Sequence, residues 1–396
     1  MDYNFSPWPS FTSKEIESVK DVLSSNKVNY WTGEECRKFE KEFAIWSDSK
    51  FAVALANGTL ALDIAFKVLG ISNGDEVIVT SRSYIASISS IINSNATPVF
   101  VDVDPCSQNI TPKNISSAIT DKTKAIVCVH LAGWPCEMDE IMAIAKEYDL
   151  FVIEDCAQAH GAKYKGSSVG SIGDIGCWSF CQDKIMTTGG EGGMVTTNDK
   201  SLWLKMWEYK DHGKSYEAVY NREHPEGFRW LHESFGTNWR MTEMQGAIGR
   251  IQLSFMPEWT RIRNRNATIL SNAFSKFAGN NGLLRIPQLK YDDENVHAYY
   301  KYYTFVKQEA LKKGWDRDRI IAEILSKGVP CMHGSCSEVY LEKAFDNTGL
   351  RPNERLPIAK KLGETSMVFL VHPTLNENEM HKIAEVATSV FSKAVG

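Results

Sequence analysis

The sequence predicts an α/β fold, with a large domain built on a mostly parallel sheet flanked by helices and a smaller α+β domain at the C-terminal end. Short runs rich in β-branched residues alternate with helical patterns through roughly the first 200 residues. Alternation of this kind implies parallel strands joined by right-handed crossovers. Past about residue 240 a long helical pattern is followed by a mixed region. We therefore place the large domain at residues 1–255 and the small domain at 256–396.

Four runs in the first part have the composition of buried strands, and helical stripes lie between them. The predicted strands are Val77–Thr80, Pro98–Val103, Ala125–Val129 and Leu150–Glu154. The predicted stripes are Leu60, Ala61, Ile64, Ala65, Val68 and Leu69 in one helix, and Ile141, Ala145 and Tyr148 in another. Near the start, Thr12 and Glu15 form a capping-box pattern. The apolar residues that follow this pattern are Ile16, Val19 and Leu23.

The C-terminal part begins with a long helical pattern that runs from Met241 past Trp259. Pro257 is expected to kink or interrupt this helix. Further elements are predicted as a strand at Tyr302–Val306 and helices near Asp316–Ser326 and Glu377–Lys393.

Composition excludes several classes of protein. The 396 residues carry 44 basic and 49 acidic side chains, a net charge of −5 that argues against a general nucleic-acid binder. The first residues lack the features of a signal peptide, and no apolar run reaches the roughly 18 residues of a membrane span. The nine cysteines form no CxxC pair, which fits reduced thiols in the cytoplasm. Zinc binding by Cys177, Cys181 and His160 is not expected from their spacing.

The segment 152–194 contains the strongest chemical signal. A predicted strand ends in Glu154 and Asp155, and ligands bind at the carboxyl edge of a parallel sheet. Lys184 follows about 30 residues later beside a glycine-rich stretch. A buried acid and a lysine suit a pyridine cofactor, pyridoxal 5'-phosphate (PLP), because the acid keeps the ring nitrogen protonated and the lysine forms the Schiff base. Either residue alone would be read as a helix cap or a solvated lysine, but the combination favours PLP.

A second element supports this interpretation. Asn57, Gly58 and Thr59 follow an apolar run and open the helical stripe that starts at Leu60. Free N–H groups and the positive end of a helix dipole make such a junction a natural phosphate site. Asn-Gly alone would more often be a plain turn.

These motifs together resemble the DegT/DnrJ/EryC1/StrS family of sugar aminotransferases, PLP enzymes of the aspartate-aminotransferase-like fold type I. The resemblance covers nearly the whole chain, from Trp31–Gly33 to His372–Leu375. Its motifs are NGTLAL, DEVIVTSRSYIAS, PVFVDVDP, IEDCAQAHGA, GGEGG and NWRMTEMQGAIG. The resemblance implies that Asp155 pairs with the pyridine nitrogen and that Lys184 forms the internal aldimine. It also implies phosphate binding by the backbone of Gly58 and Thr59 and by the hydroxyl of Ser179.

Three further roles follow from the resemblance. Tyr84 matches the aromatic residue that stacks on the cofactor ring, and Gln158 matches a residue on the hydroxyl side of the ring. Asn238 matches an asparagine that reaches the phosphate of the neighbouring subunit, which implies a homodimer with shared active sites.

The chain departs from the family pattern at Arg82, Asp183 and Tyr300, and we expect these changes to affect the sugar pocket and to leave the cofactor chemistry untouched. His160 has either a packing or a catalytic role. His333 and His372 are expected in the core rather than in the pocket. The arginines Arg261, Arg263 and Arg265 are expected on a solvated helix face, with binding of a substrate anion as the alternative.

The function implied by the resemblance is transfer of an amino group from an amino acid, by analogy glutamate, to a keto-sugar. The expected acceptor is a nucleotide-linked 4-keto-6-deoxy hexose, in the synthesis of cell-surface amino sugars such as lipopolysaccharide O-antigen or of secondary metabolites. A PLP-dependent sugar dehydratase is an alternative, although such enzymes usually replace the lysine with histidine. A transaminase of a non-nucleotide keto-sugar or of a terminal aldehyde is another. A nicotinamide oxidoreductase would need a G-x-G-x-x-G motif, which Asn57–Leu62 lacks.

Overall fold

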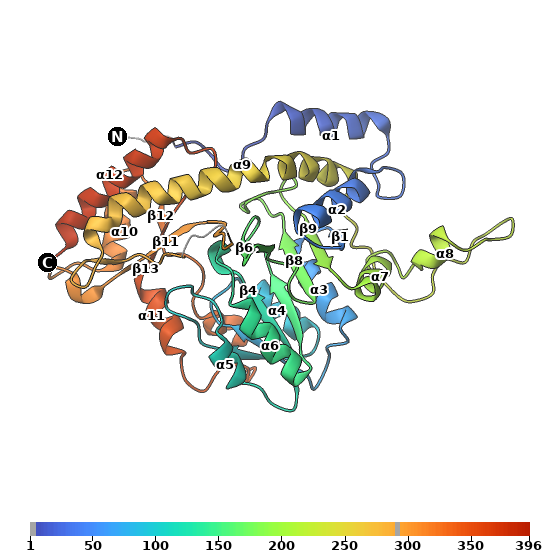
Figure 1. Ribbon diagram of the computed structural model, residues 1–396, viewed down its shortest axis with the longest axis horizontal. Coiled ribbons are helices and arrows are strands. Elements are labelled where there is room, and N and C mark those ends of the chain that lie inside the picture. Colours follow the sequence, from blue (N-terminus) through green and yellow to red (C-terminus); the bar gives the residue numbers. More distant parts are fainter. Residues whose placement is uncertain (1–4, 290–293) are drawn as a thin grey trace.

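The computed structural model describes residues 5–289 and 294–396. A large sheet lies in the middle of the molecule, and a long helix runs across its top towards a smaller part that contains the C-terminus (Figure 1). Among the described residues, none of the helices combines the length and the apolar character that a membrane span requires.

The large sheet has seven strands in the order β1-β9-β8-β5-β4-β2-β3. Its strands are β1 (Phe51–Leu55), β2 (Glu76–Thr80), β3 (Thr97–Val101), β4 (Thr123–Val129), β5 (Phe151–Asp155), β8 (Ile175–Ser179) and β9 (Gly193–Thr197). Every neighbouring pair is parallel except those that include β9, which runs antiparallel to β1 and β8. The predicted mostly parallel sheet is confirmed. The four predicted strands correspond to β2, β3, β4 and β5, with ends that differ by one or two residues.

Helices flank this sheet on both faces, and others build the C-terminal part (Figure 1). They are α1 (Ser13–Ser25), α2 (Glu35–Trp46), α3 (Gly58–Val68), α4 (Ala86–Asn93), α5 (Pro112–Ser116), α6 (Met138–Tyr148), α7 (Lys200–Tyr209), α8 (Tyr216–Tyr220), α9 (Glu243–Phe274), α10 (Arg317–Leu325), α11 (Pro357–Thr365) and α12 (Glu377–Ala394). The predicted stripe of α3 packs into the core through Ala61, Ile64 and Ala65. In α6, Ile141 and Ala145 are buried, but Tyr148 at the end of the helix is exposed.

Helix α1 begins with the predicted capping box, but the apolar residues Ile16 and Leu23 that follow it do not form its buried face. Thr12 accepts a hydrogen bond from the N3 backbone and Glu15 accepts one from the Thr12 backbone. The side chains of Ile16 and Leu23 are 65% and 52% exposed, whereas Glu15 and Val22 are buried. The reason is that α1 packs against α9, where Gln252 donates to the carboxylate of Glu15 at 3.4 Å.

Helix α9 is continuous over 32 residues, so Pro257 does not interrupt it, and the alternative expectation of a kink stays a prediction. A proline removes one hydrogen bond of the helix ladder, but packing holds the helix on both sides of it. The N-terminal half contacts α1 and α2, and the C-terminal half contacts α12. The predicted domain boundary near residue 255 falls inside this helix, and the division into residues 1–255 and 256–396 stays a prediction.

A smaller, fully antiparallel sheet lies in the C-terminal part, in the order β10-β11-β13-β12. Its strands are β10 (Leu284–Arg285), β11 (Tyr302–Val306), β12 (Cys331–Met332) and β13 (Ser366–Phe369). The two short strands β6 (Lys163–Tyr164) and β7 (Ser167–Ser168) form a separate hairpin. The predictions for β11, α10 and α12 are confirmed. The second hydrophobic core forms between this sheet and the helices, and Phe274 of α9 lies in it.

Replacing Phe274 with alanine should lower the free energy of unfolding by about 3–5 kcal/mol, because the substitution leaves a cavity in a packed core. The ring of Phe274 is fully buried and lies 5.3 Å from that of Phe369 and 5.2 Å from that of Phe391. Urea unfolding measures the change. The matched control is Tyr148→Ala, at a side chain that is 47% exposed, which should change stability little. Equal effects of the two substitutions would contradict the assignment of this core.

Candidate active site

A cavity of about 670 Å³ opens at the carboxyl edge of the large sheet. Several elements meet there: the start of α3, the loop after β2, the ends of β5 and β8, and loops of the C-terminal part. The predicted site residues that line it are Gly58, Thr59, Tyr84, Asp155, Gln158, Ser179 and Lys184. Their convergence follows from the topology, because parallel strands place their carboxyl ends at one edge.

Asp155 is the last residue of β5, and its buried carboxylate faces the cavity. The hydroxyl of Ser87 donates to it at 2.6 Å and the backbone N–H of Ala157 at 3.1 Å. Burial raises the pKa of Asp155, and these two donors and the nearby Lys184 offset only part of the rise. A cationic group bound in the cavity would therefore be favoured by this carboxylate. Ser87 was missed in the sequence, where it reads as one of several serines in a helix.

The amine of Lys184 contacts an acidic neighbour. Its Nζ lies 3.3 Å from Oδ1 of Asp183 and 5.4 Å from the ring centre of Tyr300. The hydroxyl of Tyr300 donates to the other oxygen of Asp183. Burial acts to raise the pKa of Asp183, but Lys184 and Tyr300 outweigh it and hold the pKa below its usual value. Asp183 and Tyr300 therefore lie next to the Lys184 amine, and the expectation that they leave the cofactor chemistry untouched stays a prediction.

The backbone carbonyl of Lys184 is held by a residue of the N-terminal segment. The indole Nε1 of Trp8 donates to the Lys184 carbonyl at 2.9 Å. The Trp8 peptide bond to Pro9 is cis. No sequence pattern connects residues so far apart in the chain, so this contact could not be predicted.

The start of α3 has the features of an anion site. The side chain of Asn57 caps the helix by accepting from the N–H of Leu60 at 3.0 Å. A Cβ at Gly58 would lie 2.5 Å from Cβ of Ser179, so only glycine fits against β8 there. The N–H groups of Gly58 and Thr59 belong to the first turn, whose donors have no partner within the helix. Together with the Ser179 hydroxyl, they form a cradle for a phosphate.

The remaining predicted residues differ in position. Tyr84 lies on the cavity wall with 70% of its side chain exposed. The side-chain oxygen of Gln158 accepts from the N–H of Ala132 at 2.8 Å, which fixes the amide against the cavity. Asn238 is exposed, forms a bridge to Asp211, and is not among the described residues that line this cavity.

The expectations for the histidines are partly wrong. His160 is fully buried with its ring 5.2 Å from that of Trp178, and burial lowers its pKa to about 3, so it is a neutral packing residue. His372 is buried, as expected. His333 is not in the core: its side chain is 59% exposed and lies 3.1 Å from Asp318.

Of the three arginines on α9, only two are on a solvated face. Arg261 pairs with Glu258 at 2.6 Å and Arg265 pairs with Glu377 at 3.4 Å. Arg263 is 1% exposed, which contradicts the prediction. Residues two apart on a helix lie on nearly opposite sides of it, so Arg263 faces the interior.

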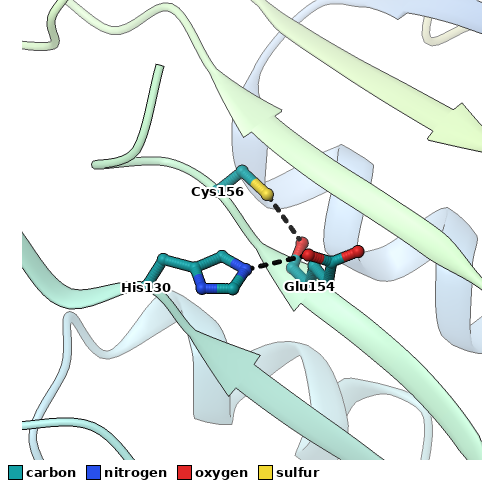
Figure 2. A group of neighbouring side chains, drawn as sticks. All are labelled: His130, Glu154 and Cys156. Atoms are coloured by element: carbon teal, nitrogen blue, oxygen red, sulfur yellow. Dashed lines mark hydrogen bonds and ion pairs between the residues drawn. The ribbon is translucent and has the colours of Figure 1, made fainter. Parts of the chain in front are cut away.

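Glu154 precedes Asp155 on β5 and has a structural role. Figure 2 shows His130 directed at its carboxylate and Cys156 directed at its backbone oxygen. His130 Nε2 lies 2.9 Å away, and three backbone N–H groups also donate to the carboxylate. They belong to Gly170, Ile172 and Gly173. Nδ1 of His130 accepts from the N–H of Cys136 at 3.0 Å, so Nε2 carries the proton.

His130, Glu154 and Cys156 are the one group within residues 5–289 and 294–396 whose ligand atoms are close enough to hold a metal ion. The carboxylate already accepts four hydrogen bonds, and the histidine proton points at it. The oxygens are thus occupied by donors rather than open to a cation. This group fixes the end of β5 and the segment 170–173.

Comparison with known proteins shows the family of this chain. Residues 9–388 match the sequence profile of the DegT/DnrJ/EryC1/StrS aminotransferase family. The GDP-perosamine synthase of Escherichia coli O157:H7 is 35% identical over 384 residues, which cover 97% of each chain. The aminotransferase structure of Psychrobacter cryohalolentis has a TM-score of 0.97 at 64% identity, covering 98% of this chain and 99% of that one. A putative sugar aminotransferase of Streptococcus pneumoniae in its PLP form has a TM-score of 0.85 at 26% identity, covering 99% of both.

Replacing Glu154 with glutamine should lower the free energy of unfolding by about 1–3 kcal/mol at pH 7, because backbone donors lose a charged acceptor. Burial acts to raise the pKa of Glu154, but His130 and the backbone donors hold it below the ordinary 4.5. Its stabilising effect is therefore full above pH 4.5 and is lost as the pH falls through the lower, folded-state pKa.

The difference between the wild type and this variant should accordingly shrink in acid, as measured by urea unfolding at several pH values. Glu147→Gln, at an exposed site on α6, is the control and should show no such difference. A gap that persists or widens in acid would refute this account of Glu154.

Proposed function

Because this chain belongs to the DegT/DnrJ/EryC1/StrS aminotransferase family, we propose that it uses pyridoxal 5'-phosphate to move an amino group from an amino acid to a keto-sugar. The observation that carries the proposal is the meeting of Lys184, Asp155 and the start of α3 in one cavity. An amine, a carboxylate and an anion site are the three groups that hold a PLP molecule.

The residues that line the cavity suit the phosphate and the ring of this cofactor. Gly58 has no room for a Cβ against Ser179, which leaves the N–H groups of Gly58 and Thr59 open to close approach by a phosphate. The Asp155 carboxylate is buried and is favoured in its charged form by a cationic partner, as a protonated pyridine nitrogen would be. Tyr84, on the wall, would offer an aromatic face for stacking on the ring, and Gln158, which lines the same cavity, would contact its hydroxyl side by analogy with the family.

When bound, PLP supplies an aldehyde that condenses with amines and a ring that withdraws electrons. Lys184 would hold this group through its Nζ, and as a free amine the same Nζ would serve as the acid–base group of the transfer. Asp183, 3.3 Å from this atom, accepts a hydrogen bond from the free amine and orients it. Tyr300 fixes Asp183 in turn.

For the donor and acceptor we propose glutamate and a nucleotide-linked 4-keto-6-deoxy hexose, in cytoplasmic synthesis of amino sugars for the cell surface or for secondary metabolites. The volume of about 670 Å³ leaves room for a sugar beside the cofactor. GDP-perosamine synthase, at 35% identity, is named for an amino sugar linked to a nucleotide. A PLP-dependent sugar dehydratase on the same fold is the alternative, and the presence of Lys184 in place of histidine argues against it.

We further propose a homodimer whose sites are shared. The segment after α8 projects from the body of the molecule (Figure 1). Phe228, Trp230 and Phe235 in this arm are 75%, 80% and 100% exposed. Exposed aromatic residues of this kind mark a protein interface, and Asn238 follows directly. Since Asn238 does not line the cavity of its own chain, the site it serves is that of a second copy.

Replacing Lys184 with alanine should abolish covalent attachment of PLP and lower turnover by at least about 10²–10⁴-fold, because the proton-moving amine is lost. PLP should still bind through Asp155 and the cradle at Gly58. Borohydride reduction followed by mass spectrometry should find the cofactor on Lys184 in the wild type and on no lysine in the variant. Lys200→Ala, at an exposed site, is the control and should behave as the wild type. Near-normal activity of the Lys184 variant would overturn the proposed mechanism.

Two inactive variants, Lys184→Ala and Asn238→Ala, should restore activity when their subunits are mixed and allowed to exchange. In the mixed dimer one site has Lys184 from one subunit and Asn238 from the other, so about a quarter of all sites are intact at equal amounts. Sedimentation checks that each variant alone is a dimer. No recovery after exchange, or a fully active monomer, would show that Asn238 does not serve a partner's site.

A further inference from the structure

A second cavity, of about 290 Å³, lies next to the first. Asp183, Tyr300 and Lys301 line both cavities and form the wall between them. The rest of its lining comes from the N-terminal segment around Trp8, from α9, and from the residues after β13. The second cavity therefore lies behind the side chains that contact the Lys184 amine.

Arg263 lines this cavity from α9, and none of the described residues forms an ion pair with it. Its Nη1 donates to the carbonyls of Tyr299 at 3.2 Å and Tyr300 at 3.4 Å, and its guanidinium lies 5.3 Å from the ring of Trp8. Its Nε is buried and has no hydrogen-bond partner in the described part of the chain. Its neighbours along the helix, Arg261 and Arg265, both pair with glutamates. A buried guanidinium without a counter-ion is costly.

The charges around the cavity do not balance within the described residues. Arg263 and Lys301 are cationic, and Asp183 is the one acid in the described lining. Asp183 already accepts from Tyr300 and contacts Lys184, so it does not neutralise Arg263. Burial and the nearby Arg263 lower the pKa of His372 to about 4, so this histidine is neutral at pH 7. The cavity thus has an excess of positive charge.

We propose that the second cavity binds a small organic carboxylate, with Arg263 as its counter-ion, and that it receives the carboxylate of the amino-acid donor. The second part rests on the proposed function. The apolar wall at Leu370 and Val371 and the stacked rings of Trp8 and His372 suit the methylene groups of such a molecule. The volume is at the lower end of ligand pockets, which matches an amino acid rather than a nucleotide.

Calorimetric titration of the PLP-loaded enzyme with glutarate tests this. Glutarate has two carboxylates but neither an amine nor a ketone, so its binding does not depend on transamination. We expect the wild type to bind it and Arg263→Gln to bind it at least about tenfold more weakly, because a charge-assisted contact is lost. The matched control Arg261→Gln, on the same helix but exposed, should bind as the wild type. Absence of binding to the wild type, or equal binding by Arg263→Gln, would overturn the proposal.

A second variant covers the case in which Arg263→Gln fails to fold. Ile383→Phe leaves Arg263 in the chain and puts a larger side chain in the lining of the same cavity. It should also weaken glutarate binding at least about tenfold, and unchanged affinity would overturn the site. A crystal of the wild type soaked with glutarate should place a carboxylate against the guanidinium.

These experiments distinguish a failure of the proposed transaminase function from a failure of the proposed carboxylate site. If Arg263-dependent glutarate binding is found in a protein that does not transaminate, the proposed function fails and the carboxylate site stands. If the enzyme transaminates and Arg263→Gln leaves both glutarate binding and the glutamate concentration for half-maximal rate unchanged, the second cavity is not the donor site. A rise in that concentration, with the amination of the acceptor unaffected, is the expected result.

Discussion

Two consecutive carboxylates at the end of β5 set the geometry of the whole site. Successive side chains of a strand point to opposite faces, so Glu154 and Asp155 lie in different surroundings. Glu154 accepts four hydrogen bonds and locks the strand end to His130 and to the segment 170–173. Asp155, by contrast, accepts two hydrogen bonds within the described part of the chain, from the Ser87 hydroxyl and the Ala157 backbone. Glu154 thus supports the strand end, whereas the carboxylate of Asp155 can still bind a ligand.

The two carboxylates near Lys184, those of Asp155 and Asp183, also differ in their surroundings. Asp155 reaches the cavity from the sheet, and Asp183 reaches the amine from the adjacent position in the chain. Burial raises the pKa of Asp155, whereas Lys184 and Tyr300 hold that of Asp183 below its usual value despite burial. Asp183 is thus already paired in the protein alone, and Asp155 becomes paired only when a cation binds. This difference supports the proposal that Asp155 pairs with the cofactor and that Asp183 positions the lysine.

The sequence predicted the parts of the fold that local patterns determine. Buried strands β2 to β5 and the caps of α1 and α3 follow from composition and spacing, and the shared motifs located Lys184 and Asp155. Contacts made by tertiary packing were missed. The face of α1 that contacts α9 is decided by Glu15 and Val22, although Ile16 and Leu23 are more apolar.

The wrong prediction for Arg263 has a different cause, because the spacing of the three arginines already indicated that Arg263 lies on another helix face. Arginines at i and i+4 share a helix face, and the one at i+2 is rotated by about 200°. Arg261 and Arg265 therefore fit the solvated face, and Arg263 does not. The spacing alone implied a buried guanidinium. Its environment could not be predicted, because it includes Trp8, a residue of the N-terminal segment.

Trp8 connects these features physically. Its indole N–H holds the carbonyl of Lys184, its ring lies over the guanidinium of Arg263, and it stacks on His372. Arg263 in turn donates to the carbonyl of Tyr300, whose hydroxyl fixes Asp183 beside the lysine amine. A ligand that pairs with Arg263 would thus act on the same short chain of contacts that positions Lys184. The N-terminal segment, remote in sequence from every motif of the site, thus lines the second cavity and holds the backbone of Lys184 in the first.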